Sequence, residues 1–133
     1  MESRTASSWI DAFVGHDPVL EARLRAIYGD DEALLDERRR AYVNLLTRFG
    51  MAYGDEEVIV TRSPARINLR GVHVDHRGGH VNYVCINRET LVAAHARDDD
   101  HVFMLNTEPK KYGPRSFNVT DELPPHRRGD WLA

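Results

Sequence analysis

Cysteine and long apolar runs are almost missing from this sequence of 133 residues. The single cysteine, Cys85, has no partner for an internal disulfide, and it lies in an apolar run where we expect a buried thiol. No apolar stretch approaches the ~20 residues that a membrane-spanning helix needs, and residues 1–15 lack the apolar centre of a signal peptide. These features predict a cytoplasmic protein without a membrane partner.

An excess of positive charge is missing as well. The net charge is −3, whereas nucleic-acid-binding domains usually carry a basic surface. We therefore expect no nucleic-acid partner. The sequence also lacks the glycine-rich phosphate-binding motifs GxGxxG and GxxxxGK followed by Ser or Thr. Residues that bind a nucleotide cofactor consequently stay unassigned.

The chain is long enough for one domain, and its pattern changes near residue 50. Before that point, Asp17 and Pro18 are typical of a helix start and Gly29 of its end. A second helix is expected from Asp30 or Asp31 to Gly50, with the charged run 37–40 mostly on its solvent face. Short β-branched and aromatic runs follow at 57–61, 81–86, 90–96, 102–105 and 116–119. The sequence predicts an α+β fold, with N-terminal helices followed by a mostly antiparallel sheet.

Residues 63–82 contain three Arg, three His, one Asp and two Asn among three Gly, and they lie between two apolar segments. This arrangement is typical of a binding loop held at both ends by strands. Pro64 is expected to stiffen the start of the loop, and Gly78 with Gly79 to form its reverse turn. We therefore place the candidate functional site here.

Three interpretations of this loop remain open from the residues alone. His73, Asp75 and His76 have a spacing that suits a metal, as in a metal-dependent hydrolase, although we assign no metal ligand. Alternatively, Asp75 accepts two hydroxyl groups of a polyol while Arg66, His73 and Asn68 donate hydrogen bonds or fix the loop. The third interpretation is a solvated turn with weak local ion pairs.

Residues 57–106 resemble the N-terminal signature of galactokinases, which are members of the GHMP kinase superfamily. The family pattern is Ala-Pro-Gly-Arg-Val-Asn-Leu-Ile-Gly-Glu-His-Thr-Asp-Tyr-Asn-Gly-Gly, and this chain has SPARINLRGVHVDHRGG without a gap. The shared positions are Pro64, Arg66, Asn68, Leu69, Gly71, His73, Asp75, Gly78 and Gly79. The resemblance implies the N-terminal part of the GHMP kinase fold.

Roles follow from the resemblance position by position. Arg66 corresponds to a catalytic arginine near the phosphorylated hydroxyl, where a permanent cation stabilises charge on the transferring phosphoryl group. Substrate-binding roles are implied for Asn68, His73, Asp75, Gly78 and Gly79. Val72 stands where galactokinases have a sugar-binding Glu, so the sugar, galactose or a related one, stays open.

The complete enzyme implied by the resemblance transfers the γ-phosphate of ATP, with Mg²⁺, to a sugar hydroxyl. The chain lacks the Gly-Ser-Ser run that this superfamily uses, so we expect it to be inactive alone and to hold no cofactor without a missing C-terminal part. Within a single partial domain 1–133, we predict a helical segment 1–50, a sugar-binding region 51–121, and a loop with a truncated helix start at 122–133. The alternative of another class is a non-catalytic sugar-binding or sensor module.

Overall fold

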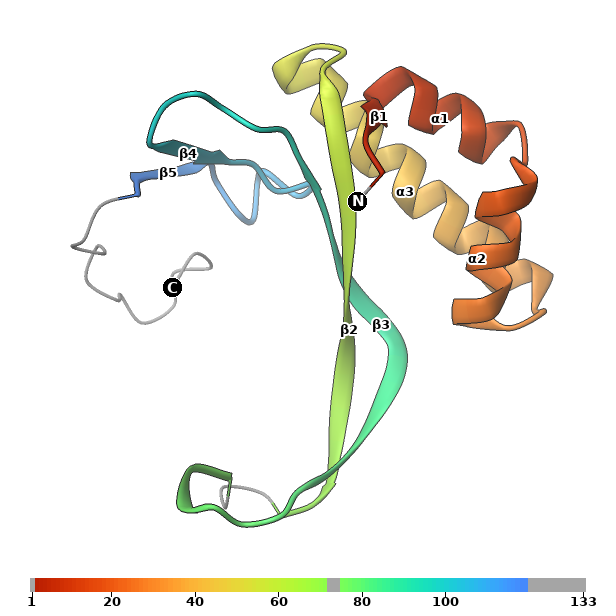
Figure 1. Ribbon diagram of the computed structural model, residues 1–133, viewed down its shortest axis with the longest axis vertical. Coiled ribbons are helices and arrows are strands. Elements are labelled where there is room, and N and C mark those ends of the chain that lie inside the picture. The colour runs from red at the N-terminus through yellow and green to blue at the C-terminus, as the bar shows by residue number, and fades with distance from the viewer. Residues whose placement is uncertain (1, 72–74, 120–133) are drawn as a thin grey trace. The chain divides into compact units, whose positions relative to one another are not determined.

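The computed structural model describes residues 2–71 and 75–119, which divide into two compact units after Ala94. The first unit contains the helices α1 (Ala6–Val14), α2 (Pro18–Tyr28) and α3 (Glu32–Tyr53) and the strands β1 (Arg4–Thr5), β2 (Glu57–Arg70) and β3 (Asn82–Ala94). Its sheet has the order β1-β2-β3, and both strand pairs are antiparallel (Figure 1). The predicted α+β class is therefore confirmed, and the comparison with the GHMP kinase fold stays a prediction.

In the second unit, residues 95–119 are described, and they contain the antiparallel pair β4 (His101–Met104) and β5 (Arg115–Asn118). His101 and Asn118 are opposite each other, and His101 Nδ1 lies 2.8 Å from Asn118 Oδ1. Lys110 and Lys111 lie in an exposed turn between the two strands. The loop and helix start predicted at 122–133 lie outside the described residues. Among the residues that the structure describes, no helix is long and apolar enough to cross a membrane.

Helix α2 begins and ends where its local chemistry predicts. The Asp17 carboxylate accepts hydrogen bonds from the backbone N–H groups of Val19 (2.9 Å) and Leu20 (3.1 Å), and Pro18 occupies the first turn. These are backbone donors that the helix itself leaves without partners. Gly29 follows the last turn with φ +80°, a conformation that glycine adopts without strain.

Helix α3 begins as expected at the Asp31 cap but ends later than predicted. Asp31 accepts hydrogen bonds from the first-turn N–H groups, and the helix continues to Tyr53. The end predicted at Gly50 is wrong, because Gly50 keeps a helical backbone and Gly54 (φ +89°) supplies the left-handed residue that ends the helix.

The core lies between the helices and the adjoining half of the β2–β3 hairpin. Leu35 and Leu46 of α3 and Val58 of β2 have no exposed side-chain surface. The Trp9 indole N–H donates to the Val58 carbonyl oxygen at 3.1 Å, which fixes α1 against β2. The buried apolar residues are Ala6, Trp9, Phe13, Leu20, Leu24, Leu35, Tyr42, Leu46, Phe49 and Val58.

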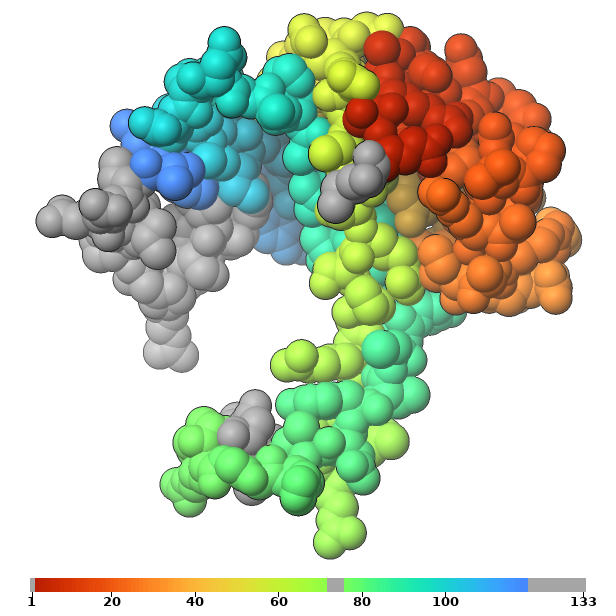
Figure 2. Space-filling model, viewed as in Figure 1, coloured from red at the N-terminus to blue at the C-terminus, as the bar shows by residue number. Residues whose placement is uncertain are grey.

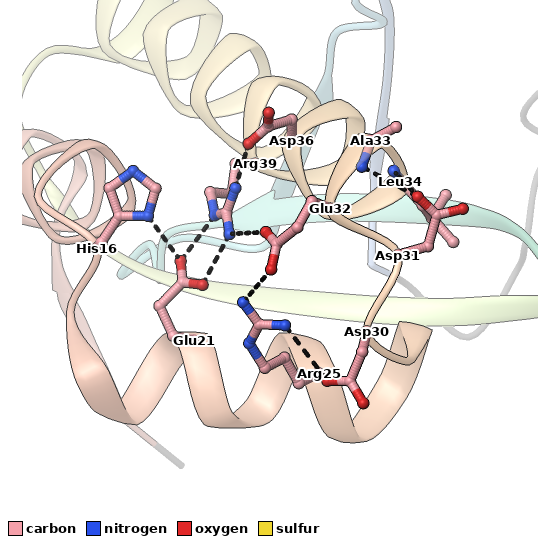
Figure 3. Close-up of polar contacts among 10 residues, drawn as sticks. All are labelled: His16, Glu21, Arg25, Asp30, Asp31, Glu32, Ala33, Leu34, Asp36 and Arg39. Atoms are coloured by element: carbon pink, nitrogen blue, oxygen red, sulfur yellow. Dashed lines mark hydrogen bonds and ion pairs between the residues drawn. The ribbon is translucent and has the colours of Figure 1, made fainter.

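Two arginines of α3 are buried, which the sequence interpretation did not expect. Arg38 and Arg39 are 8% and 7% exposed, so their predicted place on the solvent face is wrong. The Arg39 guanidinium donates two hydrogen bonds of 2.7 Å to the Glu21 carboxylate of α2 (Figure 3). Arg38 Nη1 lies 3.5 Å from Glu89 of β3. Both cations can be buried because carboxylates from other elements pair with them.

A buried carboxylate joins the helices to the sheet. The Glu89 side chain is 1% exposed and accepts a hydrogen bond from Tyr28 of α2 at 2.5 Å. Arg62 of β2 donates through Nε to the other carboxylate oxygen, and its guanidinium lies 5.3 Å from the centre of the Tyr28 ring. Burial, followed by the hydrogen bond to Glu89, raises the pKa of Tyr28 and keeps this phenol protonated as the donor.

The Glu21–Arg39 pair predicts an acid-sensitive contribution to stability. The hydrogen bond from Arg39 lowers the pKa of Glu21 below its ordinary value of 4.5, with burial acting in the opposite direction. A carboxyl group with a lowered folded-state pKa stabilises the fold above its unfolded pKa, and this contribution is lost as pH falls through the folded pKa. We expect the free energy of unfolding to decrease as the pH is lowered below 4.5. Urea unfolding from about pH 6 to about pH 3 measures this fall, and an unchanged pH dependence in Glu21→Gln contradicts the assignment.

Candidate functional site: the loop end of the β2–β3 hairpin

The first part of the polar stretch that was expected to be a loop is a strand. Residues 63–70 belong to β2, which pairs with β3 from Ile59 opposite Ala94 to Arg70 opposite Asn82. The loop prediction for these residues is wrong, because backbone pairing with β3 is available to polar residues as well as apolar ones. The register shifts between Pro64 and Arg66, where proline has no N–H to donate. The connection between the strands is limited to residues 71–81.

Two glycines shape this connection. Gly71 has φ +88°, and a Cβ atom placed on it would lie 2.5 Å from the His80 carbonyl oxygen. Gly78 has φ +74°, and it lies next to the short 3-10 helix η1 (Asp75–Arg77). A positive φ at Gly78 fits the reverse turn expected there, whereas Gly79 has no positive φ. The chain thus leaves β2 and returns to β3 through backbone conformations that favour glycine.

A matched pair of substitutions tests the role of Gly71. Gly71→Ala combines the positive φ with the close approach to His80, so we expect it to lower the free energy of unfolding by about 1–3 kcal/mol. Gly50→Ala, inside α3 with nothing within 4 Å of the added Cβ, is expected to raise it by about 0.5–1 kcal/mol. Chemical unfolding of both variants checks the pair, and equal effects contradict this explanation of Gly71.

Arg66 and Asn68 lie on one face of the hairpin. Their Cα partners on β3 are Cys85 and Tyr83, and directly opposite residues point to the same side of a sheet. The Oδ1 atom of Asn68 is shielded from solvent and accepts no hydrogen bond from any described residue. Cys85 is exposed, so the expectation of a buried thiol is wrong. The loop end of the hairpin extends beyond the helices, which accounts for this exposure (Figures 1 and 2).

The Arg66 guanidinium stacks on an aromatic ring that the sequence interpretation did not select. Its Cζ atom lies 4.5 Å from the centre of the Tyr83 ring, a cation–π geometry. Arg66 itself is exposed, and it forms no ion pair with the carboxylates that the structure describes. The alternation of strand residues could have placed Tyr83 beside Asn68 had the pairing register been known.

The other expected site residues lie at the connection. Val72 and His73 lie outside the described residues, and Asp75 begins η1 without a described side chain. The roles implied for His73, Asp75, Gly78 and Gly79 stay predictions. Among the residues described, no group of three or more His, Cys, Asp or Glu side chains is placed to hold a metal ion. Because His73 is not among them, the hypothesis of a metal site at 73, 75 and 76 stays untested.

The described helix N-termini do not fit the phosphates of ATP. Free backbone N–H groups at such a terminus bind phosphate well. At α2 and α3, however, the carboxylates of Asp17 and Asp31 already accept from these donors and would repel a phosphate. The first turn of α1 is capped by the Thr5 hydroxyl. We therefore derive no phosphoryl-transfer step through these residues.

Comparison with known proteins shows that the hairpin is similar to a segment of galactokinases. Residues 47–96 match the family model described as the galactokinase galactose-binding signature. The galactokinase of Enterococcus faecalis is 35% identical over 77 residues, which are 58% of this chain and 20% of that protein. The Roseiflexus sp. galactokinase is 44% identical over 55 residues, 41% of this chain and 14% of that protein.

A longer but weaker match involves the galactokinase of Dictyostelium discoideum, with 28% identity over 113 residues, 84% of this chain and 22% of that protein. The chain thus spans about a fifth of the length of the galactokinases it matches. No solved structure is significantly similar to it. The signature covers β2, the connection and β3. The resemblance to galactokinases is therefore confirmed, and residues 47–96 of this chain are similar to the galactose-binding signature of that family.

Proposed function

We propose that this chain is the N-terminal, sugar-binding part of a galactokinase-like enzyme. The complete enzyme transfers the γ-phosphate of ATP to a hydroxyl group of galactose or a related sugar. The observation that carries the proposal is the match of residues 47–96 to the galactose-binding signature. The antiparallel hairpin supports it, because two paired strands hold the ends of a short connection that contains most of the expected sugar contacts.

Each proposed role uses a different property of the side chain. Arg66 is a permanent cation on the strand that enters the connection, and it stabilises negative charge on a transferring phosphoryl group. Asp75 accepts hydrogen bonds from two ring hydroxyls through its two carboxylate oxygens. Asn68 supplies an amide that fixes the loop or contacts the sugar, and His73 supplies a further sugar contact.

We assign the ATP and Mg²⁺ of the complete enzyme to residues outside this chain. This assignment is supported by the capped N-termini of α2 and α3, which leave no phosphate cradle there. We therefore expect the sugar-binding chain to act together with an ATP-binding part of the enzyme, which belongs to the same polypeptide or to another one. The single cysteine agrees with a reducing compartment, and we place the enzyme in the cytoplasm.

The proposal is tested by measuring binding and turnover separately. The purified chain is expected to bind galactose in a calorimetric titration and to release no ADP when galactose, ATP and Mg²⁺ are present together. A chain that binds neither galactose nor any related sugar in a panel contradicts the proposal. ATP turnover that Arg66→Ala abolishes contradicts the assignment of ATP binding to residues outside this chain.

The second candidate is a non-catalytic sugar-binding or sensor module, which the lack of a recognisable phosphate motif in this sequence favours. Both candidates predict sugar binding without turnover by the chain alone. The genomic sequence downstream of Ala133 separates them. A phosphate-binding motif in the same reading frame supports the enzyme, and a stop codon or an unrelated domain supports the module.

Val72 is the position where we expect the sugar preference to be set. Valine offers no side-chain hydrogen bond where galactokinases have a Glu, so Val72→Glu is expected to shift preference toward galactose by about tenfold or more, the value of one charge-assisted hydrogen bond. A panel of sugars that differ at single hydroxyls measures the shift. Val119→Glu, at an exposed valine in the second unit, is the matched control. If galactose already ranks first and Val72→Glu leaves the ranking unchanged, Val72 does not set specificity.

A further inference from the structure

We infer that Tyr83 is a positioning residue for Arg66. Its ring holds the guanidinium at one place on the hairpin face, so that the cation meets an anionic group on the bound sugar. The inference rests on the proposed function, because it assigns Arg66 to a phosphoryl group. It adds a residue that is neither among the motif positions shared with galactokinases nor among the expected sugar contacts.

The contact joins neighbouring strands across one face. Tyr83 is opposite Asn68 in the register, and Arg66 is opposite Cys85, so the Arg66 and Tyr83 side chains meet along a diagonal of the same face. The Arg66 Cζ atom is 4.5 Å from the centre of the Tyr83 ring, and the tyrosine remains 39% exposed. An exposed arginine otherwise samples many rotamers, and a ring contact reduces that freedom before a ligand binds.

Arg62 is a useful comparison for Arg66, because Arg62 has a structural role and a carboxylate partner. Both arginines lie on β2 and stack on a tyrosine, Arg62 on Tyr28 at 5.3 Å and Arg66 on Tyr83 at 4.5 Å. The charge of Arg62 is compensated by the buried Glu89 carboxylate. The charge of Arg66 has no such partner among the described carboxylates. Tyr83 therefore holds Arg66 without neutralising its charge, whereas Glu89 neutralises Arg62.

A pair of ligands tests this role in the full chain. Galactose reports binding of the neutral sugar, and galactose 1-phosphate reports the same sugar with an anionic group. Tyr83→Val removes the ring and introduces a β-branched residue that also favours strands. We expect it to weaken binding of galactose 1-phosphate more than that of galactose, by about two- to fivefold, the factor that an exposed cation–π contact provides.

Three further variants show whether Tyr83 acts through Arg66. Tyr83→Phe keeps the ring and is expected to restore the wild-type ratio of the two affinities. In an Arg66→Ala background, Tyr83→Val is expected to have no further effect on that ratio, as a double-mutant cycle requires. Tyr112→Leu removes the ring that Lys111 contacts in the second unit and is the matched control. Tyr83→Thr replaces Tyr83→Val if the latter does not fold.

A ligand-free measurement keeps the inference separate from the proposed function. In the free chain, NMR relaxation of the Arg66 Nε–Hε group is expected to show increased motion in Tyr83→Val and wild-type motion in Tyr83→Phe. If the wild-type chain binds neither sugar, the proposed function fails, and this relaxation result alone decides whether Tyr83 holds the cation. Unchanged motion overturns the inference. An unchanged affinity ratio in a chain that binds both sugars overturns it equally.

Discussion

Replacing Glu89 by alanine is expected to lower the free energy of unfolding by about 3–5 kcal/mol, because it leaves the half-buried Arg62 without a carboxylate and the buried Arg38 paired only with Glu37. Arg38 and Arg62 both reach Glu89, and the Tyr28 hydroxyl donates to it. Small domains are stabilised by only about 5–15 kcal/mol, so this loss is a large part of the total. Urea unfolding followed by circular dichroism measures it.

An exposed glutamate provides the control for this substitution. Glu56 precedes β2 and is exposed, so Glu56→Ala is expected to change the free energy of unfolding by no more than about 0.5 kcal/mol. A Glu89→Ala variant as stable as Glu56→Ala would contradict the account of how the helices are joined to the sheet. Adding Arg62→Leu to Glu89→Ala is expected to recover part of the stability, since one unpaired cation is then removed.

Replacing Asp75 by alanine is expected to weaken sugar binding by on the order of a hundredfold or more. A carboxylate that accepts two hydroxyl groups makes two charge-assisted hydrogen bonds, each worth roughly 1.5–3 kcal/mol. Calorimetric titration with galactose, or with the sugar that binds most tightly in the panel, measures the loss. Asp75→Asn keeps one carbonyl acceptor and is expected to lie between the wild type and Asp75→Ala.

Asp98→Ala is the control for Asp75, because Asp98 is an exposed aspartate in the second unit. It is expected to leave sugar affinity unchanged. If Asp75→Ala binds sugar as tightly as Asp98→Ala, the role implied for Asp75 is wrong. The similarity to galactokinases would then stand without this carboxylate as the sugar anchor.

Features set by neighbouring residues were predictable from the sequence. The cap at Asp17, the proline after it and the end at Gly29 all act within one or two turns of α2. The helix start at Asp31 and the turn at Gly78 have the same local origin. The pattern of loop residues that resembles galactokinases was also visible without a structure, because it depends on residue identity and spacing alone.

Features that depend on distant partners were not predictable in the same way. Arg38 and Arg39 formed part of a charged run, and their burial depends on carboxylates in β3 and α2. The strand from Ser63 to Arg70 had a polar composition, and only its pairing with β3 shows that it continues β2. Tyr83 belongs to no sequence motif. Its contact with Arg66 depends on the pairing of the two strands, which the sequence does not show.

The most direct test of the central claim is a residue-resolved NMR titration of the isotope-labelled chain with galactose. Saturable chemical-shift changes are expected to concentrate at the loop end of the hairpin, between Arg66 and Tyr83, with smaller changes in the second unit. Asp75→Ala is expected to abolish them over the same concentration range. The absence of saturable changes with any sugar of the panel, or changes confined to residues outside the signature region 47–96, would contradict the claim that this hairpin binds a sugar.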